Sequence, residues 1–123
     1  MRKKRCVLMS GRSLCNDQVL SDALQKIAVV VKSAANSQVE ALMATKPVDL
    51  VILEISQEHL ADVDLIKHLK QQFPQTVIIV VDGDADREVI ARAFSYGAKD
   101  AFRKPYNRAL IVERVKVLLS CMS

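Results

Sequence analysis

Short runs of aliphatic and β-branched residues alternate along the chain with segments of helical periodicity. Five such runs predict strands, at Arg5–Ser10, Ala28–Lys32, Leu50–Ile55, Val77–Val81 and Asp100–Arg103. After each run, apolar residues recur at the spacing of an amphipathic helix, within 19–27, 39–42, 65–73, 89–94 and 110–118. The pattern therefore predicts five consecutive strand–helix units.

Residues with known end preferences lie at several of the predicted helix ends. Ser37 and Glu40 have the spacing of a capping box, and Asn107 is placed to cap the last helix. Pro74 follows the third helix, and Gly97 is placed to end the fourth. These signals agree with the helix positions that the periodicity predicts.

The predicted strands are continuously apolar instead of alternating with polar residues. Such strands are buried on both faces, so the sheet is expected to be parallel, with helices on each side and right-handed crossovers. The predicted fold is a three-layer α/β/α sandwich built from a doubly wound (βα)5 sheet.

Length and composition limit the class of protein further. The 123 residues match one domain, expected over 1–123 with a basic lead-in at 1–4. No apolar run exceeds five residues, so we expect no membrane span, no signal peptide and a cytoplasmic location. Cys6, Cys15 and Cys121 lack CxxC spacing, so neither a disulfide framework nor a zinc site is expected.

The net charge of +4 is distributed unevenly along the chain. Residues 1–36 hold seven basic and two acidic groups, residues 37–86 hold three and nine, and residues 87–123 hold eight and three. The run Arg2–Arg5 alone accounts for the net excess and lacks interleaved aromatic residues, so direct binding to nucleic acid is not expected.

Ligands of open parallel sheets bind outside the carboxyl ends of the strands, which makes the residues there the candidates for chemistry. Ser10, Gly11 and Arg12 follow the first strand, and Glu54 lies at the end of the third. Asp82 follows the fourth strand, and Lys104 follows the fifth.

Three phrases of the sequence resemble the receiver domain of bacterial two-component response regulators, and the resemblance extends from about Arg5 to Leu119. They are Pro47–Glu54, which resembles the strand before the phospho-accepting aspartate, Phe102–Tyr106, which resembles the strand with the family's lysine, and Tyr96-Gly97-Ala98. The resemblance implies a flavodoxin-like fold with strand order 2-1-3-4-5. It also implies a role in phosphorelay signal transduction through protein–protein interaction, without enzymatic activity of its own.

The residues that differ from the family pattern lie in its phosphorylation site. Ser10 and Gly11 stand where the resemblance implies two acidic residues that hold Mg²⁺, and Glu54 replaces the phospho-accepting aspartate. Asp82 replaces a serine or threonine, and Ala101 replaces an aromatic switch residue. Because phosphoryl transfer depends on positioning and on the metal, we expect a pseudo-receiver with a degenerate site, no metal and no cofactor.

Charged residues at this site suggest a way to hold one conformation. Glu54 and Asp82 can each offer a carboxylate to Lys104, and Arg12 can reach Glu54 from the first loop. A partly buried network of this kind would mimic a locked state. The alternative is a set of solvated loop charges.

The resemblance also implies a partner surface on the fourth helix, the fifth strand and the fifth helix. The candidate contact residues are Arg92, Tyr96, Lys99, Arg103, Arg108 and Lys116. The resemblance implies that this face contacts an output domain or a second copy, and the charge of its basic residues complements the acidic middle segment, which favours self-association. The alternative is an ordinary solvated helix surface.

Two other functions are open at this stage. Glu54 and Asp82 could still support Mg²⁺-dependent phosphorylation, although two carboxylates alone rarely hold this ion. The loop Ser10–Ser13 could instead bind an anion or nucleotide with its backbone N–H groups. His59 and His68 lie around the third helix, not at a strand end, and His68 is expected at the surface.

Overall fold

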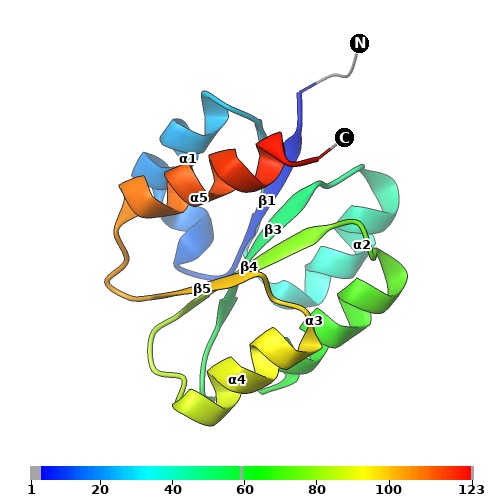
Figure 1. Ribbon diagram of the computed structural model, residues 1–123, viewed down its shortest axis with the longest axis vertical. Helices are drawn as coiled ribbons and strands as arrows, with labels where there is room; N and C mark the ends of the chain where they lie inside the picture. Colours follow the sequence, from blue (N-terminus) through cyan, green and yellow to red (C-terminus); the bar gives the residue numbers. More distant parts are fainter. Residues whose placement is uncertain (1–3, 59, 123) are drawn as a thin grey trace.

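The computed structural model describes residues 4–58 and 60–122. A single parallel sheet has the order β2-β1-β3-β4-β5, as predicted (Figure 1). Its strands are β1 (Cys6–Ser10), β2 (Val29–Ser33), β3 (Leu50–Ile55), β4 (Val77–Asp82) and β5 (Asp100–Arg103). The helices are α1 (Gln18–Gln25), α2 (Val39–Thr45), α3 (Ala61–Gln72), α4 (Arg87–Tyr96) and α5 (Arg108–Ser120), with short 3₁₀ helices η1 (Leu14–Asn16) and η2 (Asn36–Gln38).

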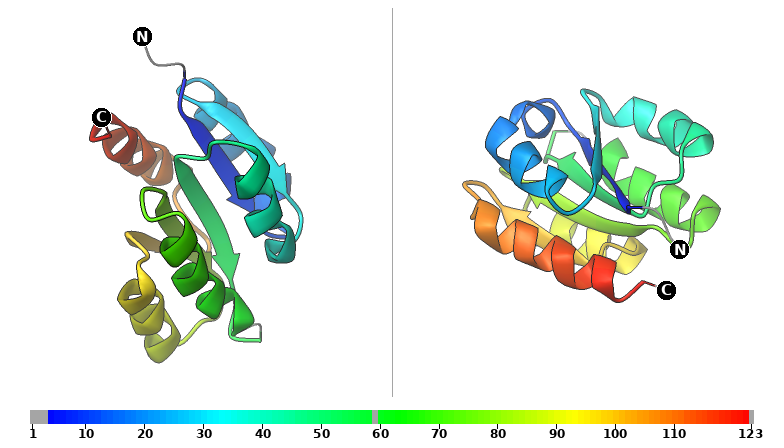
Figure 2. Two further views of the ribbon diagram at one scale, coloured as in Figure 1. Left: turned by 90° about the vertical axis from the view of Figure 1, so that its right-hand side faces the viewer. Right: turned by 90° about the horizontal axis from the view of Figure 1, so that it is seen from above.

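Helices cover both faces of the sheet and make three layers (Figure 2). Val7 and Met9 of β1 belong to the core that includes residues of α1 and α5, and Leu8 belongs to the core on the other face, which includes residues of α2, α3 and α4. The predicted sandwich and flavodoxin-like topology are thus confirmed. Within the described residues, no helix has both the length and the apolar character needed to cross a bilayer.

The predicted elements agree with the observed ones to within a residue for every strand. The capping box at Ser37 and Glu40 was wrong, because Ser37 lies inside η2 and Gln38 precedes α2 without a side-chain cap. Asn107 does cap α5, where its side chain accepts a hydrogen bond from Leu110 N at 3.2 Å. The expected lead-in falls mostly on residues 1–3, which, like His59, lie outside the described part of the chain.

Gly97 ends α4, as predicted, in a conformation that favours glycine, with φ of +124°. A Cβ atom at this position would lie 2.6 Å from Cγ of Lys70. The Lys70 ammonium donates in turn to the main-chain oxygens of Pro74 and Thr76, at 3.0 and 2.7 Å. Gly97 therefore allows the carboxyl ends of α3 and α4 to approach each other closely.

Candidate functional site

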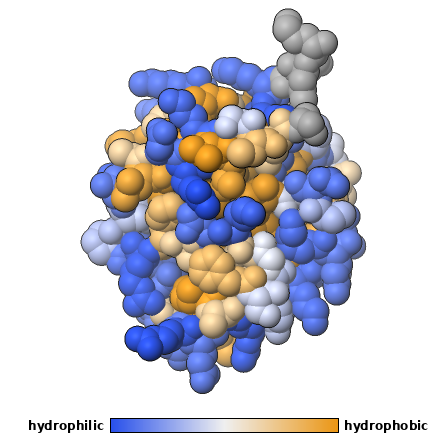
Figure 3. Space-filling model, in the orientation of Figure 1, coloured by the Kyte–Doolittle hydropathy of each residue, from blue (hydrophilic) through white to orange (hydrophobic). Residues whose placement is uncertain are grey.

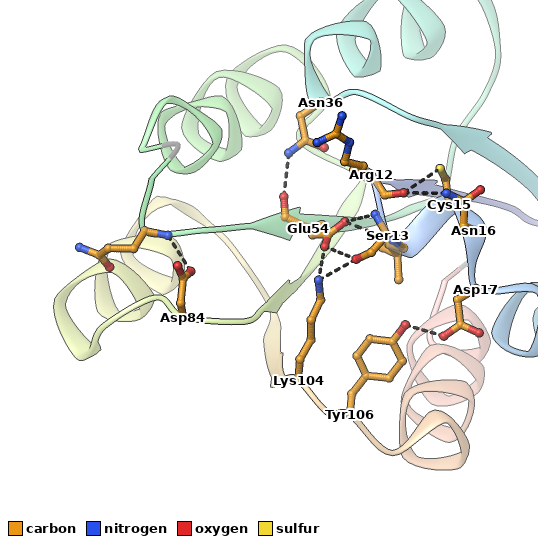
Figure 4. Close-up of polar contacts among 12 residues, drawn as sticks. Arg12, Ser13, Cys15, Asn16, Asp17, Asn36, Glu54, Asp84, Lys104 and Tyr106 are labelled. Carbon is orange, nitrogen blue, oxygen red and sulfur yellow. Dashed lines mark hydrogen bonds and ion pairs between the residues drawn. The ribbon is translucent and has the colours of Figure 1, made fainter.

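The carboxyl end of β3, the loop after β1 and the residues after β5 bring Glu54, Ser13 and Lys104 together (Figure 4). Glu54 is the next-to-last residue of β3, and Lys104 follows β5 directly. The loop from Gly11 to Ser13 connects β1 to η1 and passes beside Glu54. Parallel strands place all these groups at one edge of the sheet.

The Glu54 carboxylate accepts hydrogen bonds from four donors. Oε1 accepts from the backbone N–H groups of Ser13 and Leu14, at 3.0 and 3.1 Å. Oε2 accepts from the Ser13 hydroxyl and from the Lys104 ammonium. Lys104 also donates to the Ser13 hydroxyl at 2.7 Å. The predicted Glu54–Lys104 contact is therefore present, and both carboxylate oxygens are occupied.

These donors determine the electrostatics of Glu54, whose side chain is 15% exposed. Burial on its own raises the pKa of this carboxyl. Hydrogen bonds from Lys104, Ser13 and Leu14, together with the Lys104 charge, outweigh burial and hold the pKa below its usual range. Glu54 is therefore an anion at neutral pH, held at the amino-terminal end of η1.

Gly11 provides the space that Glu54 occupies. Its φ is +137°, and a Cβ atom at this position would lie 2.3 Å from both Cβ and Oε1 of Glu54. Real Cβ atoms do not approach other heavy atoms so closely. The absence of a side chain at position 11 and the long side chain at position 54 are therefore structurally coupled.

Ser10 is fully buried and takes part in a separate chain of hydrogen bonds. Its hydroxyl donates to Oδ1 of Asn36 at 2.7 Å, and the Asn36 amide donates to the main-chain oxygen of Glu54 at 2.7 Å. These hydrogen bonds connect β1 to β3 through Asn36, which lies in the segment after β2. The Ser10 hydroxyl thus has a structural partner within the domain.

The residues at the positions where the family pattern has its Mg²⁺ ligands do not fit this ion. This ion prefers six oxygen ligands, supplied by one or two carboxylates together with water or phosphate. Gly11 has no side chain, the Ser10 hydroxyl is buried against Asn36, and both Glu54 oxygens are bound by donors. Among the described residues, no group of three His, Cys, Asp or Glu side chains is arranged to hold a metal ion.

Asp82 pairs with a different cation from the predicted one. Its side chain is only 3% exposed, and Oδ1 lies 3.1 Å from an Nη of Arg103. The alternative Asp82–Lys104 ion pair was wrong, because Lys104 points to Glu54. Burial raises the pKa of Asp82 more than the Arg103 charge lowers it.

Arg12 does not make the predicted contact with Glu54. In Figure 4 its guanidinium group lies away from the Glu54 carboxylate, and its main-chain oxygen accepts hydrogen bonds from Cys15 and Asn16. Backbone N–H groups of Ser13 and Leu14 take the place expected for Arg12. The backbone N–H groups of the Ser10–Ser13 loop were offered in the sequence analysis to a free anion or nucleotide and not to Glu54, and the N–H group of Leu14 was not included.

Asp17 forms a second cluster next to the site, which the sequence analysis also missed. Its carboxylate caps α1 through Leu20 N at 3.0 Å and accepts a 2.5 Å hydrogen bond from the Tyr106 hydroxyl. Arg108 Nε donates to both of its oxygens at 2.9 Å. Burial alone would raise the pKa of Asp17, but these donors lower it below the usual range.

Replacement of Asp17 by asparagine should lower the free energy of unfolding by about 1 kcal/mol. Asparagine caps a helix as well as aspartate does, so the loss would come from the charge-assisted contacts of Arg108 and Tyr106. Urea denaturation measures the change. Asp22→Asn, an exposed position in the same helix, is the matched control, and an equal loss in both variants would contradict this account.

The predicted interaction face differs in part from expectation. Arg92, Lys99 and Lys116 are exposed, and Tyr96 is half-buried beneath the ammonium of Lys67. Arg103 and Arg108 form ion pairs within the domain, so they contribute less to a basic surface than predicted. Apolar surface lies between α5 and α4 over the β5 edge of the sheet (Figure 3), and exposed apolar residues of these two helices are Phe94, Leu110 and Val117.

Comparisons with known proteins agree with this fold and with the order of the motifs. The family described as "Response regulator receiver domain" matches residues 14–116. A putative NtrX-like response regulator of Rickettsia bellii is 32% identical over 88 residues, which cover 69% of this chain and 18% of that protein. The chemotaxis protein CheY of Thermotoga maritima is 28% identical over 97 residues, covering 77% of this chain and 81% of that protein.

A crystal structure of a response regulator from Thermotoga maritima has the same fold, with a TM-score of 0.84 at 24% identity. It covers 96% of this chain and 99% of that one. The chain therefore belongs to the response regulator receiver domain family, whose members have a regulatory role in two-component signalling. The match spans about a fifth of the length of the NtrX-like relative.

Proposed function

We propose that this receiver domain acts by protein–protein interaction in the cytoplasm and is not phosphorylated at Glu54. The four donors on the Glu54 carboxylate carry this proposal. A nucleophilic carboxylate needs a free oxygen directed at the incoming phosphorus atom. Both Glu54 oxygens are instead directed into the domain, one to η1 and one to Lys104.

The surroundings of Glu54 also lack the charge compensation that phosphoryl transfer requires. Metal ions neutralise the charge that develops on the transferring phosphoryl group, and positioning supplies most of the remaining catalysis. Ser10 and Gly11 offer no carboxylate for a metal. Lys104, the remaining cation of the family pattern, already neutralises Glu54.

In this proposal the Glu54 network replaces phosphorylation as the element that fixes the conformation. It joins the loop after β1 to the residues after β5, and Asp17 joins the same loop region to α5 through Arg108. A partly buried network of ionic hydrogen bonds constrains the backbone segments that it connects. The domain would then present α4, β5 and α5 to an output domain or a second copy in one shape.

The alternative of anion binding by the Ser10–Ser13 loop finds less support. The backbone donors that this loop region would offer to a phosphate, Ser13 N and Leu14 N, are bound to Glu54. A free anion would have to displace a carboxylate of the same domain. The anion at this helix end is therefore internal to the protein.

Incubation with acetyl phosphate and Mg²⁺ should leave the intact mass of the domain unchanged. A receiver with an aspartate and a complete acidic pair, treated in the same solution, shows that the phosphoryl donor is active. In parallel, beryllofluoride with Mg²⁺ should not shift the amide resonances of Gly11, Glu54, Asp82 and Lys104. A stable adduct of one phosphoryl group on Glu54 would overturn the proposal.

A further inference from the structure

An exposed stripe of side chains runs along α5. Four residues share the i, i+3, i+4, i+7 spacing that places side chains on one face of a helix, and they are Leu110, Glu113, Arg114 and Val117. Leu110 is 59% exposed and Val117 is 43% exposed. This set, the α5 stripe, therefore has an aliphatic side chain at each end and two opposite charges in the middle.

A hollow of about 360 Å³ lies along the α5 stripe and extends to β5. All four stripe residues line it, together with Asp100 and Phe102 of β5. In the described chain β5 is the last strand of the sheet, so no further strand covers Phe102 from that side. Apolar surface lies at this edge of the sheet, between α5 and α4 (Figure 3). Because the burial of aliphatic groups away from water is favourable, the hollow favours an aliphatic side chain from outside the domain.

The two charged residues of the stripe can each accept a further partner. Glu113 is exposed, and its side chain forms no hydrogen bond or ion pair with any described residue. The Nε atom of Arg114 lies 2.9 Å from Oδ2 of Asp100, and the arginine side chain is 40% exposed. A guanidinium group has five N–H donors, so one neighbouring carboxylate leaves donors for a second. Adjacent residues of a helix do not face each other, so a partner for Glu113 has to come from outside the stripe.

A second copy of α5, running in the opposite direction, complements the stripe. A twofold axis brings residue i of one copy to residue j of the other, and j to i. The charged pair and the aliphatic pair of the stripe have the same midpoint, which lies between Glu113 and Arg114. An axis through this point brings each glutamate to the second copy's arginine, and each leucine to the second copy's valine. Parallel helices would instead bring like charges together, so the charges favour the antiparallel pair.

We propose that two copies of this domain associate through antiparallel contact of their α5 stripes, with the aliphatic side chains of each copy covering the hollow of the other. The inference rests on the proposed function and deepens it, because it identifies a second copy as the partner of α5 in a contact that needs no phosphoryl group. The stripe has only four residues on each copy, and interfaces that bury less than about 1,200 Å² are weak or transient. The expected state is therefore a reversible equilibrium between monomer and dimer.

Sedimentation velocity of the domain without Mg²⁺ or phosphoryl donor measures this equilibrium. The sedimentation coefficient of the wild type should rise with protein concentration toward the value of a dimer. Leu110→Ser removes an aliphatic side chain from both halves of the contact and should weaken association by about tenfold or more. Val19→Ser is the matched control, because Val19 is 63% exposed on α1 and should not affect association. Equal weakening by both substitutions would overturn the α5 contact.

A pair of charge reversals tests the antiparallel register. Glu113→Arg places two cations in the stripe, and Arg114→Glu places two anions there. Each variant alone should associate at least about tenfold more weakly than the wild type, because like charges then face each other across the axis. A mixture of the two variants has opposite charges at both contacts and should associate again. Recovery on mixing also shows that both variants are folded.

Lys116→Glu is the control for these reversals. Lys116 is exposed on the same helix but lies outside the stripe, and its substitution changes the net charge as Arg114→Glu does. This variant alone should associate like the wild type. A mixture of Glu113→Arg and Arg114→Glu that stays monomeric, while both variants are folded by circular dichroism, would overturn the register and the proposal with it.

The remaining outcomes separate this inference from the proposed function. A wild-type domain that stays monomeric up to about 1 mM overturns the α5 dimer, even if acetyl phosphate adds no mass. A dimer that Glu113→Arg leaves unchanged uses another surface, which also overturns the α5 dimer. A phosphoryl adduct on Glu54 overturns the proposed function, whatever the oligomeric state.

Discussion

Replacement of Gly11 by alanine is expected to lower the free energy of unfolding by about 2–4 kcal/mol. Two costs add: a non-glycine residue would be held at φ of +137°, and its Cβ would lie 2.3 Å from Glu54 atoms. The Glu54 side chain has little freedom to move away, because four donors hold its carboxylate. Chemical denaturation of the wild type and the variant measures the loss.

Gly83→Ala is the matched control for this substitution. A Cβ atom at Gly83 would lie 3.6 Å from Cδ of Lys104, an ordinary van der Waals distance, so its effect should stay within about 0.5 kcal/mol. The double variant Gly11→Ala with Glu54→Gly removes the clash with both Cβ and Oε1 of Glu54 and keeps the strained backbone. Its loss should be smaller than the sum of the two single losses, and strict additivity would contradict the coupling.

The architecture could be predicted because it depends on patterns that local sequence carries. Continuous apolar runs such as Leu50–Ile55 and Val77–Val81 indicate strands covered on both faces, and helical periodicity between them leaves few topologies. The strand order came from the resemblance to receivers, and the structure has that order. Boundaries were accurate where turn chemistry is distinctive, as at Gly97 and Asn107.

The prediction of a helix cap was wrong at Ser37. Ser37 and Glu40 have capping-box spacing, but the 3₁₀ helix η2 precedes α2 directly, so Ser37 lies inside η2 and does not begin the helix. Asp17 and Asp86 cap α1 and α4, but they could not be predicted as caps, because isolated acidic residues are common in loops. Only the three-dimensional position of the following N–H groups distinguishes a cap from a solvated acid.

The candidate site could be predicted in its Glu54–Lys104 ion pair and not in its other ion pairs or in its backbone hydrogen bonds. Opposite charges at neighbouring strand ends made the Glu54–Lys104 pair foreseeable. The preference of Asp82 for Arg103 depends on which way each side chain of β5 and its loop points, and backbone donors at Leu14 leave no trace in the sequence. The hollow beside Phe102 likewise appears only when α5 and β5 are placed together.

Glu54→Gln is expected to lower the free energy of unfolding by about 2 kcal/mol at pH 7. Glutamine keeps one oxygen for the N–H groups of Ser13 and Leu14, but its NH₂ group cannot accept from the Lys104 ammonium and faces it with a second donor. One cation of the site is then left without its partner in a half-buried position. Glu58→Gln, at an exposed position, is the control with the same change of charge.

The stability difference between the wild type and Glu54→Gln should depend on pH in a direction that the pKa of Glu54 determines. The pKa of Glu54 is lowered on folding from an ordinary value of 4.5, so its ionised form stabilises the native state above pH 4.5. That contribution disappears as the pH falls below 4.5 and passes through the lower pKa of the folded state. The difference in stability between the wild type and Glu54→Gln should therefore be constant from pH 6 to 8 and should shrink steadily in acid. Asp17 and Asp82 titrate in both proteins and cancel, so a difference independent of pH down to about pH 2 would mean that the Glu54 charge does not stabilise the fold.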